Sequence, residues 1–240
     1  MKKFHLEVVH PSWRECIEQG LETLDFHYLQ TLYDSEDWLP GHEYIFNAFT
    51  LPVSKVQYVL FGESPYPRKK SAIGYAFWDG DVDEIWSPTG LSKKVNRATS
   101  LRNIVKMMLL AEGLLNPNKL SQEDIAALDK SHLIQTNQQL FENFQRHGIL
   151  LLNACPVLQK TSRLKDARAW KPFLATILKF LIKNNPNVKF IYLGKIANNI
   201  EPLVQSLHPP ALKVEHPYNH SFITNFKVLD FFKPLHLLKK

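Results

Sequence analysis

The sequence has few cysteines, and those it has are isolated. Only Cys16 and Cys155 occur among its 240 residues, and neither forms a Cys-x-x-Cys pair. A cysteine-ligated zinc or iron–sulfur site is therefore not expected, and we predict no metal and no cofactor. Two lone cysteines also fit a reducing compartment.

The sequence also lacks a long apolar run. No run approaches the ~20 apolar residues of a membrane-spanning helix. Near the start, His10, Arg14 and Glu15 interrupt the chain too early for the apolar core of a signal peptide. We therefore expect a cytoplasmic protein that does not act at a membrane.

Glycine-rich phosphate loops are absent as well. The first long apolar run is followed by residues 62–65, Gly-Glu-Ser-Pro, which contain one glycine and a proline. This pattern fits neither a P-loop nor a dinucleotide-binding fingerprint. A nucleotide-binding α/β protein of unrelated chemistry is an alternative that this absence weakens.

What the chain does have is an excess of basic residues over a normal apolar content. Lysine and arginine number 29 against 23 acidic residues, and 45% of residues are hydrophobic. The apolar content is typical of a globular chain with a real core. No linker, repeat or low-complexity stretch divides it, so we predict one domain over residues 1–240. The formal net charge of +6 points to an anionic partner.

Four apolar runs each end in a short polar turn. They cover residues 56–61, 149–152, 188–193 and 212–215. Helical patterns lie between them, which predicts an α/β fold with three αβα layers around a central, mainly parallel four-stranded sheet. Because parallel strands end at one edge, Tyr66, Asn153 and His216 are expected to converge on one pocket.

The helical patterns can be placed by their apolar spacing and their caps. We predict helices over residues 12–33, 44–49, 136–146, 169–183 and 195–207, and a helical tail over 222–238 broken by Pro234. Ser12, Ser100 and Ser121 are predicted to cap helices. Residues 68–98 are rich in glycine and proline breakers, and we predict a long loop there.

Five short motifs follow one another in the order and approximate spacing of a known family. The matching segments are residues 62–67 (Gly-Glu-Ser-Pro-Tyr-Pro), 72–77 (Ala-Ile-Gly-Tyr-Ala-Phe), 99–104 (Thr-Ser-Leu-Arg-Asn-Ile), 150–153 (Leu-Leu-Leu-Asn), and 216–221 (His-Pro-Tyr-Asn-His-Ser). They resemble the motifs of uracil-DNA glycosylases, in particular the main bacterial, eukaryotic and poxviral branch. The resemblance extends from residue 56 to about residue 230.

This resemblance implies a DNA glycosylase that hydrolyses the N-glycosidic bond of uracil or a related damaged base, in base excision repair. Phe77 would stack on the flipped-out base. Asn153 would pair with the uracil edge, because its amide both donates and accepts. Tyr66 would exclude a methyl group at C5, and His216 would stabilise negative charge on the departing base.

The resemblance also implies DNA as the partner of a monomeric enzyme. Ser100 and Ser221 match serines that hold the DNA backbone. Lys195 and Arg68 would contact phosphates. His220 stands where the family has an intercalating leucine, and would fill the gap left by the flipped base. Basic clusters at residues 68–70, 93–97 and 160–168 follow motifs at the same predicted edge.

The main departure from the family is Ser64, which replaces an aspartate that orients the attacking water. A serine hydroxyl is neutral at pH 7 and cannot supply that charge. Glu63 occupies the neighbouring glutamine position, and Gly-Glu-x-Pro resembles the thermophile-type uracil-DNA glycosylases, which lack the aspartate. Two hypotheses stay open: an active glycosylase with Glu63, Ser64 and His216 as its catalytic residues, and a catalytically weak or inactive DNA-binding protein.

Overall fold

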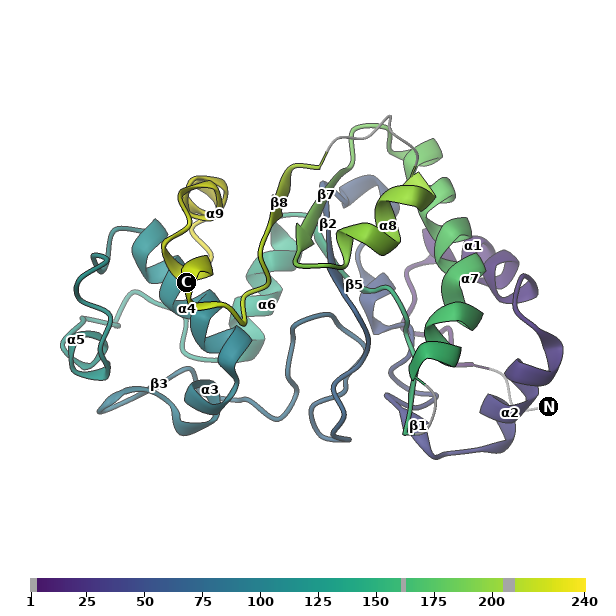
Figure 1. Cartoon of the computed structure of the whole chain (residues 1–240), viewed down its shortest axis with the longest axis horizontal. Helices are drawn as coiled ribbons and strands as arrows, with labels where there is room; N and C mark the ends of the chain where they lie inside the picture. The colour runs from purple at the N-terminus through teal and green to yellow at the C-terminus, as the bar shows by residue number, and fades with distance from the viewer. Residues whose placement is uncertain (1–3, 161–162, 205–209) are drawn as a thin grey trace.

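A four-stranded parallel sheet forms the centre of the molecule. The computed structural model describes residues 4–160, 163–204 and 210–240. The strand order is β5-β2-β7-β8, and every neighbouring pair is parallel. The strands are β2 (Tyr58–Gly62), β5 (Ile149–Asn153), β7 (Lys189–Leu193) and β8 (Leu212–Val214). This confirms the predicted three-layer α/β architecture (Figure 1).

Helices cover both faces of this sheet. One face packs against α1, α7 and α8, and the other against α4, α6 and α9 (Figure 1). Their bounds are α1 (Pro11–Glu22), α7 (Arg163–Asn184), α8 (Ala197–Val204), α4 (Thr99–Ala111), α6 (Asn137–Arg146) and α9 (Phe226–Phe232). In β2, Phe61 enters the first core and Leu60 the second. Both faces are buried, so the strands must be apolar along their whole length.

Shorter elements connect these layers. The helices are α2 (Phe26–Asp34), α3 (Lys93–Arg97) and α5 (Gln122–Ala126), with 3-10 turns at Asn47–Thr50, Val53–Lys55, His220–Thr224 and Lys233–Leu235. Two small antiparallel pairs join β1 (Trp38–Leu39) to β6 (Leu158–Gln159) and β3 (Trp86–Ser87) to β4 (Gly90–Leu91). The predicted loop over residues 68–98 therefore contains β3, β4 and α3.

The prediction of one helix over residues 12–33 is wrong. The chain breaks after α1, and the Asp25 side chain caps a second helix by accepting from the Tyr28 amide at 2.8 Å. The cap of α1 is His10, whose Nδ1 accepts from the Ser12 amide at 3.2 Å. The Ser12 hydroxyl accepts instead from the Val53 amide at 3.1 Å. A hydrogen bond to a segment distant in sequence therefore takes the place of the predicted local cap.

Other caps and boundaries agree more closely. Ser121 and Thr136 each form a capping box with the following helix. Ser100 is not a cap, because α4 begins one residue earlier, at Thr99. The tail is helical in α9 and breaks at Pro234, as predicted. The helix after β7 runs over Ala197–Val204, and residues 205–207 of its predicted span lie outside the described residues.

Candidate functional site

The ends of β2 and β5 form the floor of the candidate site. Gly62 is the register partner of Asn153, and the Ala154 amide donates to the Gly62 carbonyl at 2.9 Å. A Cβ at Gly62 would collide with Oδ1 of Asn153 and would lie 2.9 Å from the Cβ of Ala76. Glycine at this position therefore leaves room for the Asn153 carboxamide beside the segment that carries Phe77.

Asn153 is buried without an internal partner for its side chain. It is 5% exposed. No side-chain hydrogen bond within residues 4–160, 163–204 and 210–240 involves its carboxamide. Its polar atoms are not among the fully buried unsatisfied atoms of the described residues, so they reach solvent. The carboxamide is thus an accessible donor and acceptor on a largely buried residue at the carboxyl end of β5, which makes it a candidate ligand-binding group.

Phe77 adopts a backbone conformation that side chains rarely take. Its φ is 62°, in the left-handed region, and such strain clusters at functional sites. The Phe77 ring centroid lies 5.8 Å from that of His216, with 33° between the ring planes. The Tyr66 hydroxyl donates to the Phe77 carbonyl at 3.1 Å. The structure thus brings three of the predicted residues together.

The environment of Tyr66 keeps its hydroxyl protonated. Burial raises the pKa of Tyr66, and the nearby Asp79 carboxylate raises this pKa further. Its hydroxyl therefore remains a hydrogen-bond donor to the Phe77 carbonyl. This bond holds the Tyr66 ring in a fixed position.

His216 is held in one tautomer. The Tyr218 amide donates to its Nδ1 at 3.1 Å, so that nitrogen acts as an acceptor. Burial lowers the pKa of His216, and the Glu63 carboxylate works against this lowering. The imidazole is therefore neutral at pH 7, with its proton on Nε2.

Two neighbours position the His216 turn. Gly194, with φ of +86°, lies so close that a Cβ there would stand 2.9 Å from the Cβ of His216. On the other side, Asn103 of α4 donates from Nδ2 to the Pro217 carbonyl at 2.7 Å and is 1% exposed. Sequence reasoning missed Asn103. The available signal was its position inside the motif at residues 99–104.

Glu63 and Ser64 lie where the chain leaves β2. The Cys155 amide donates to the Glu63 carbonyl at 3.0 Å, which ties the turn to the end of β5. Glu63 is exposed and Ser64 is half-buried. Both also line a groove of about 580 Å³ that extends toward α7 and α8. The carboxylate of Glu63 therefore faces solvent close enough to His216 to influence its pKa.

The residues predicted to hold DNA occupy separate places around this site. Ser100, in the first turn of α4, lies on an element that packs against the 3-10 turn carrying His220 and Ser221. Lys195 is exposed directly after Gly194. Arg68, in contrast, is ion-paired at 2.9 Å with Asp79, which is 1% exposed. Its charge is partly neutralised inside its own loop.

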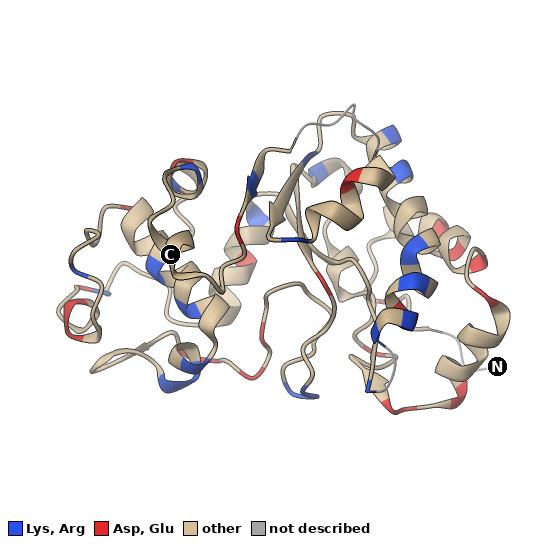
Figure 2. Ribbon diagram, in the orientation of Figure 1, with Lys and Arg blue, Asp and Glu red and all other residues tan. Residues whose placement is uncertain are grey.

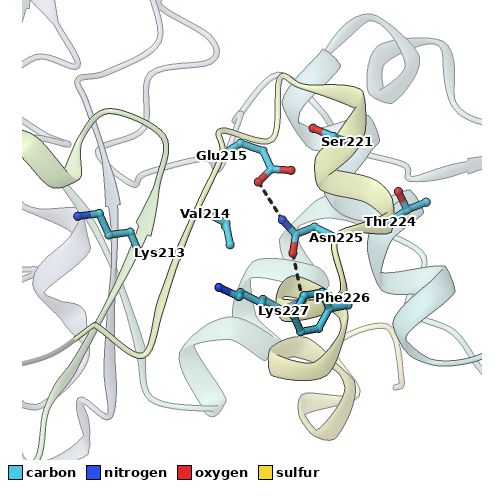
Figure 3. A pocket seen from close by; sticks show the side chains of 8 residues that line it. All are labelled: Lys213, Val214, Glu215, Ser221, Thr224, Asn225, Phe226 and Lys227. Carbon is cyan, nitrogen blue, oxygen red and sulfur yellow. Dashed lines mark hydrogen bonds between the residues drawn. The ribbon is translucent and has the colours of Figure 1, made fainter.

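Ser221 also borders an open pocket of about 550 Å³ between β8 and α9 (Figure 3). Inside it, Asn225 donates from Nδ2 to Glu215 at 2.9 Å and accepts from the Lys227 amide at 3.0 Å. The first bond joins the 3-10 turn at His220–Thr224 to the segment that follows β8. The second caps the amino end of α9.

Across residues 4–160, 163–204 and 210–240, no group of three or more His, Cys, Asp and Glu side chains could hold a metal ion. In the same ranges no helix combines the length and apolar character needed to cross a membrane. Cys16 and Cys155 are both buried free thiols.

Comparisons with known proteins agree with this fold. A crystal structure of wild-type UNG from Nitratifractor salsuginis is 42% identical, with a TM-score of 0.91 over 98% of this chain and 95% of that one. The uracil-DNA glycosylases of Amoebophilus asiaticus and Streptococcus mutans are 26% and 24% identical over 87% and 96% of this chain, and 84% and 99% of their own lengths. No protein-family model matches the chain. From its agreement with the Nitratifractor protein over nearly the whole length of both, the chain belongs to the uracil-DNA glycosylase superfamily, a group of DNA N-glycosylases.

Proposed function

We propose that this chain excises uracil from DNA by hydrolysing the N-glycosidic bond. The observation that carries the proposal is the contact between Phe77 and His216, with 5.8 Å between ring centroids, beside the unpartnered carboxamide of Asn153. An aromatic face, a neutral imidazole donor and a free amide are what recognition and release of a pyrimidine require. The kinship with uracil-DNA glycosylases supports the same reaction.

Recognition follows from the shape and polarity of the pocket. A flipped base would stack on Phe77, and its edge would meet Asn153. The Asn153 amide can donate to the uracil O4 and accept from the uracil N3–H. Cytosine presents the reverse pattern, which leaves buried groups unpaired and is strongly rejected. The rigid Tyr66 ring would occupy the space that the methyl group of thymine needs.

Bond cleavage separates charge, and the chain offers a group for each charge. As the C1′–N1 bond breaks, its electron pair goes to uracil, and the Nε2–H of His216 stabilises the resulting anion at O2. Water then bonds to C1′ of the cationic sugar, while the Glu63 carboxylate accepts a proton from it. The Ser64 hydroxyl can orient this water by a hydrogen bond. The products are free uracil and an abasic site.

A strand-cleavage assay tests the proposal. An oligonucleotide with one uracil is incubated with the protein, and abasic sites are broken with alkali. We expect cleavage by the wild type, a loss of about 10²–10³-fold in kcat for His216→Gln, and a loss of about 10²–10⁴-fold for Glu63→Gln. His132→Gln, at an exposed histidine, is the matched control and should retain full activity.

Ser64 decides between the two hypotheses. If stoichiometric wild-type protein leaves uracil, hypoxanthine and oxidised pyrimidines in place, the catalytic proposal fails. A large gain from Ser64→Asp in such an inactive parent would favour the DNA-binding alternative. We further propose that the protein acts as a single-domain monomer in the cytoplasm, and that its DNA contacts include Arg68, Ser100, Lys195, His220 and Ser221.

A further inference from the structure

The groove beside Glu63 and Ser64 has a composition of its own. Its volume is about 580 Å³, and it lies between the turns that follow β2 and β5 and the helices α7 and α8. Cations from α7 line one wall, at Arg163, Arg168 and Lys171. Glu63 and Ser64, which belong to the candidate active site, also line this groove.

The three cations have no acidic partner among the residues that the structure describes. All are exposed, and none takes part in an ion pair within those ranges. Arg168 and Lys171 are three positions apart, so they lie on the same face of α7 and repel each other. Figure 2 shows successive basic segments along this end of the helix. This repulsion weakens the helix, and no acidic side chain among the described residues offsets it. The arrangement therefore indicates an anionic ligand from outside the chain.

The acidic residue nearest to these cations in the sequence is turned away from them, and Glu63, which lines the same groove, forms no ion pair with them within the described residues. Asp166, in the first turn of α7, is 0% exposed. It accepts hydrogen bonds from the Tyr28 hydroxyl at 2.8 Å and from the Gln159 side-chain amide at 2.7 Å. Its carboxylate is thus occupied in the interior, and the outer face of the helix keeps its positive charge.

The rest of the groove is suited to more than a phosphate. Leu174 and Ile196 contribute apolar surface, and Asn198 and Asn199 of α8 contribute side-chain amides. Leu164, on the cationic wall, is 76% exposed. A nucleotide combines the three matching chemistries: an anionic phosphate, an apolar base face and a polar base edge.

We propose that this groove binds the nucleotide next to the target nucleotide on the same DNA strand. Its phosphate contacts Arg168 and Lys171, and its base lies over the apolar surface with its edge toward Asn198 and Asn199. The inference rests on the proposed function and deepens it. A base held in this groove has left its own stack, so the site favours single-stranded DNA over duplex.

Substrate truncation combined with charge removal tests this assignment. Three single-stranded oligonucleotides each carry one uracil. The uracil is the 5′-terminal nucleotide in the first, the 3′-terminal nucleotide in the second and an internal nucleotide in the third. For the wild type we expect truncation on one side to lower kcat/KM about tenfold or more, and truncation on the other side to have little effect. In the triple variant Arg163→Gln, Arg168→Gln, Lys171→Gln this difference should disappear.

The matched control is Lys179→Gln, Lys183→Gln, Lys189→Gln, which removes the same charge from exposed positions outside the groove. It should keep the wild-type response to truncation. The groove variant should also lower the slope of log affinity against log salt by roughly 0.7 for each single-strand phosphate that it no longer neutralises. Circular dichroism establishes that both variants are folded.

Two results separate this inference from the proposed function. If the groove variant releases uracil and responds to truncation as the wild type does, the groove assignment is overturned while the glycosylase activity stands. If no protein releases uracil, the same series is repeated as a binding measurement by fluorescence anisotropy, with an abasic analogue in place of uracil. If truncation on one side weakens binding by the wild type and this effect disappears in the groove variant, the groove assignment is supported. If truncation on neither side weakens binding by the wild type, the groove assignment is overturned.

Discussion

The main-chain amide of Tyr218 donates to Nδ1 of His216 at 3.1 Å, and this bond determines which ring nitrogen carries the proton. With Nδ1 used as an acceptor, the neutral ring carries its proton on Nε2. Protonation of Nδ1 would place two donors against each other and break the bond. The imidazole can therefore act as a neutral donor only while its turn keeps this geometry.

The first prediction concerns pH. Burial holds the pKa of His216 below its ordinary value of 6.5, so kcat/KM should be level above that value and fall in acid as the ring protonates. Because Glu63 raises this pKa, Glu63→Gln should lower it further. The measurement is NMR titration of the His216 ring, with the exposed Glu18→Gln on α1 as a control that leaves it unchanged.

The same shift affects stability. Below 6.5 the unfolded chain takes up a proton that the folded His216 does not, so its contribution to the unfolding free energy is present above this value. The contribution is lost as the pH falls through the folded-state pKa. Urea unfolding of His216→Asn should lack this component of the pH dependence, and an unchanged profile would contradict the assigned burial.

The second prediction concerns Gly194. A Cβ there would approach the Cβ of His216 to 2.9 Å at a φ of +86°, so Gly194→Ala should reduce kcat strongly and destabilise the fold by about 1 kcal/mol. Gly113→Ala is the matched control, since Gly113 has a φ of +73° and no atom lies within 4 Å of the position that its new methyl group would occupy. It should lose similar stability and keep activity.

The third prediction concerns Asn103. Asn103→Ala removes the bond to the Pro217 carbonyl and should cost about 1–3 kcal/mol of stability, together with a large rise in KM as the His216 turn loosens. Asn143 is a matched control, because its Nδ2 donates to the carbonyls of Leu237 and Lys239 far from the site. An equal rise in KM for Asn103→Ala and Asn143→Ala would show that Asn103 acts through stability alone.

The fourth prediction concerns the buried carboxylate of Asp166. It accepts from the Tyr28 hydroxyl and from both the main-chain and side-chain amides of Gln159. Asp166→Asn turns an NH₂ group toward one of these donors and should lower the unfolding free energy by about 3 kcal/mol. Asp230→Asn, at an exposed acid, should change it little in the same denaturation experiment.

Much of the sheet could be predicted from local patterns. The apolar run at residues 149–152 became β5 with one added residue, Asn153. The predicted convergence of Tyr66 and His216 could also be read from the strand order, because parallel strands all end on one side, and both residues contact Phe77. Helix caps formed by residues close in sequence could also be predicted, as at Ser121, whose partner Asp124 is three positions away.

What could not be predicted depends on contacts between distant segments. The bond from Asn103 to Pro217 joins residues 114 positions apart. The left-handed φ of Phe77 is not indicated by its residue type, and its carbonyl is held by the hydroxyl of Tyr66, 11 positions away. The Ser12 hydroxyl bonds to Val53, 41 positions away, and this contact overrides its local tendency to cap a helix.

The pairing of Gly62 with Asn153 has a consequence for how the protein responds to damage. Asn153 ends β5, a strand at the edge of the sheet whose residues are all buried, so opening of this segment should expose apolar core and be costly. The residue proposed to recognise the base is therefore held by the buried sheet and not by a surface loop. Heating or a destabilising mutation should lower the number of competent molecules while each surviving one discriminates between bases as before.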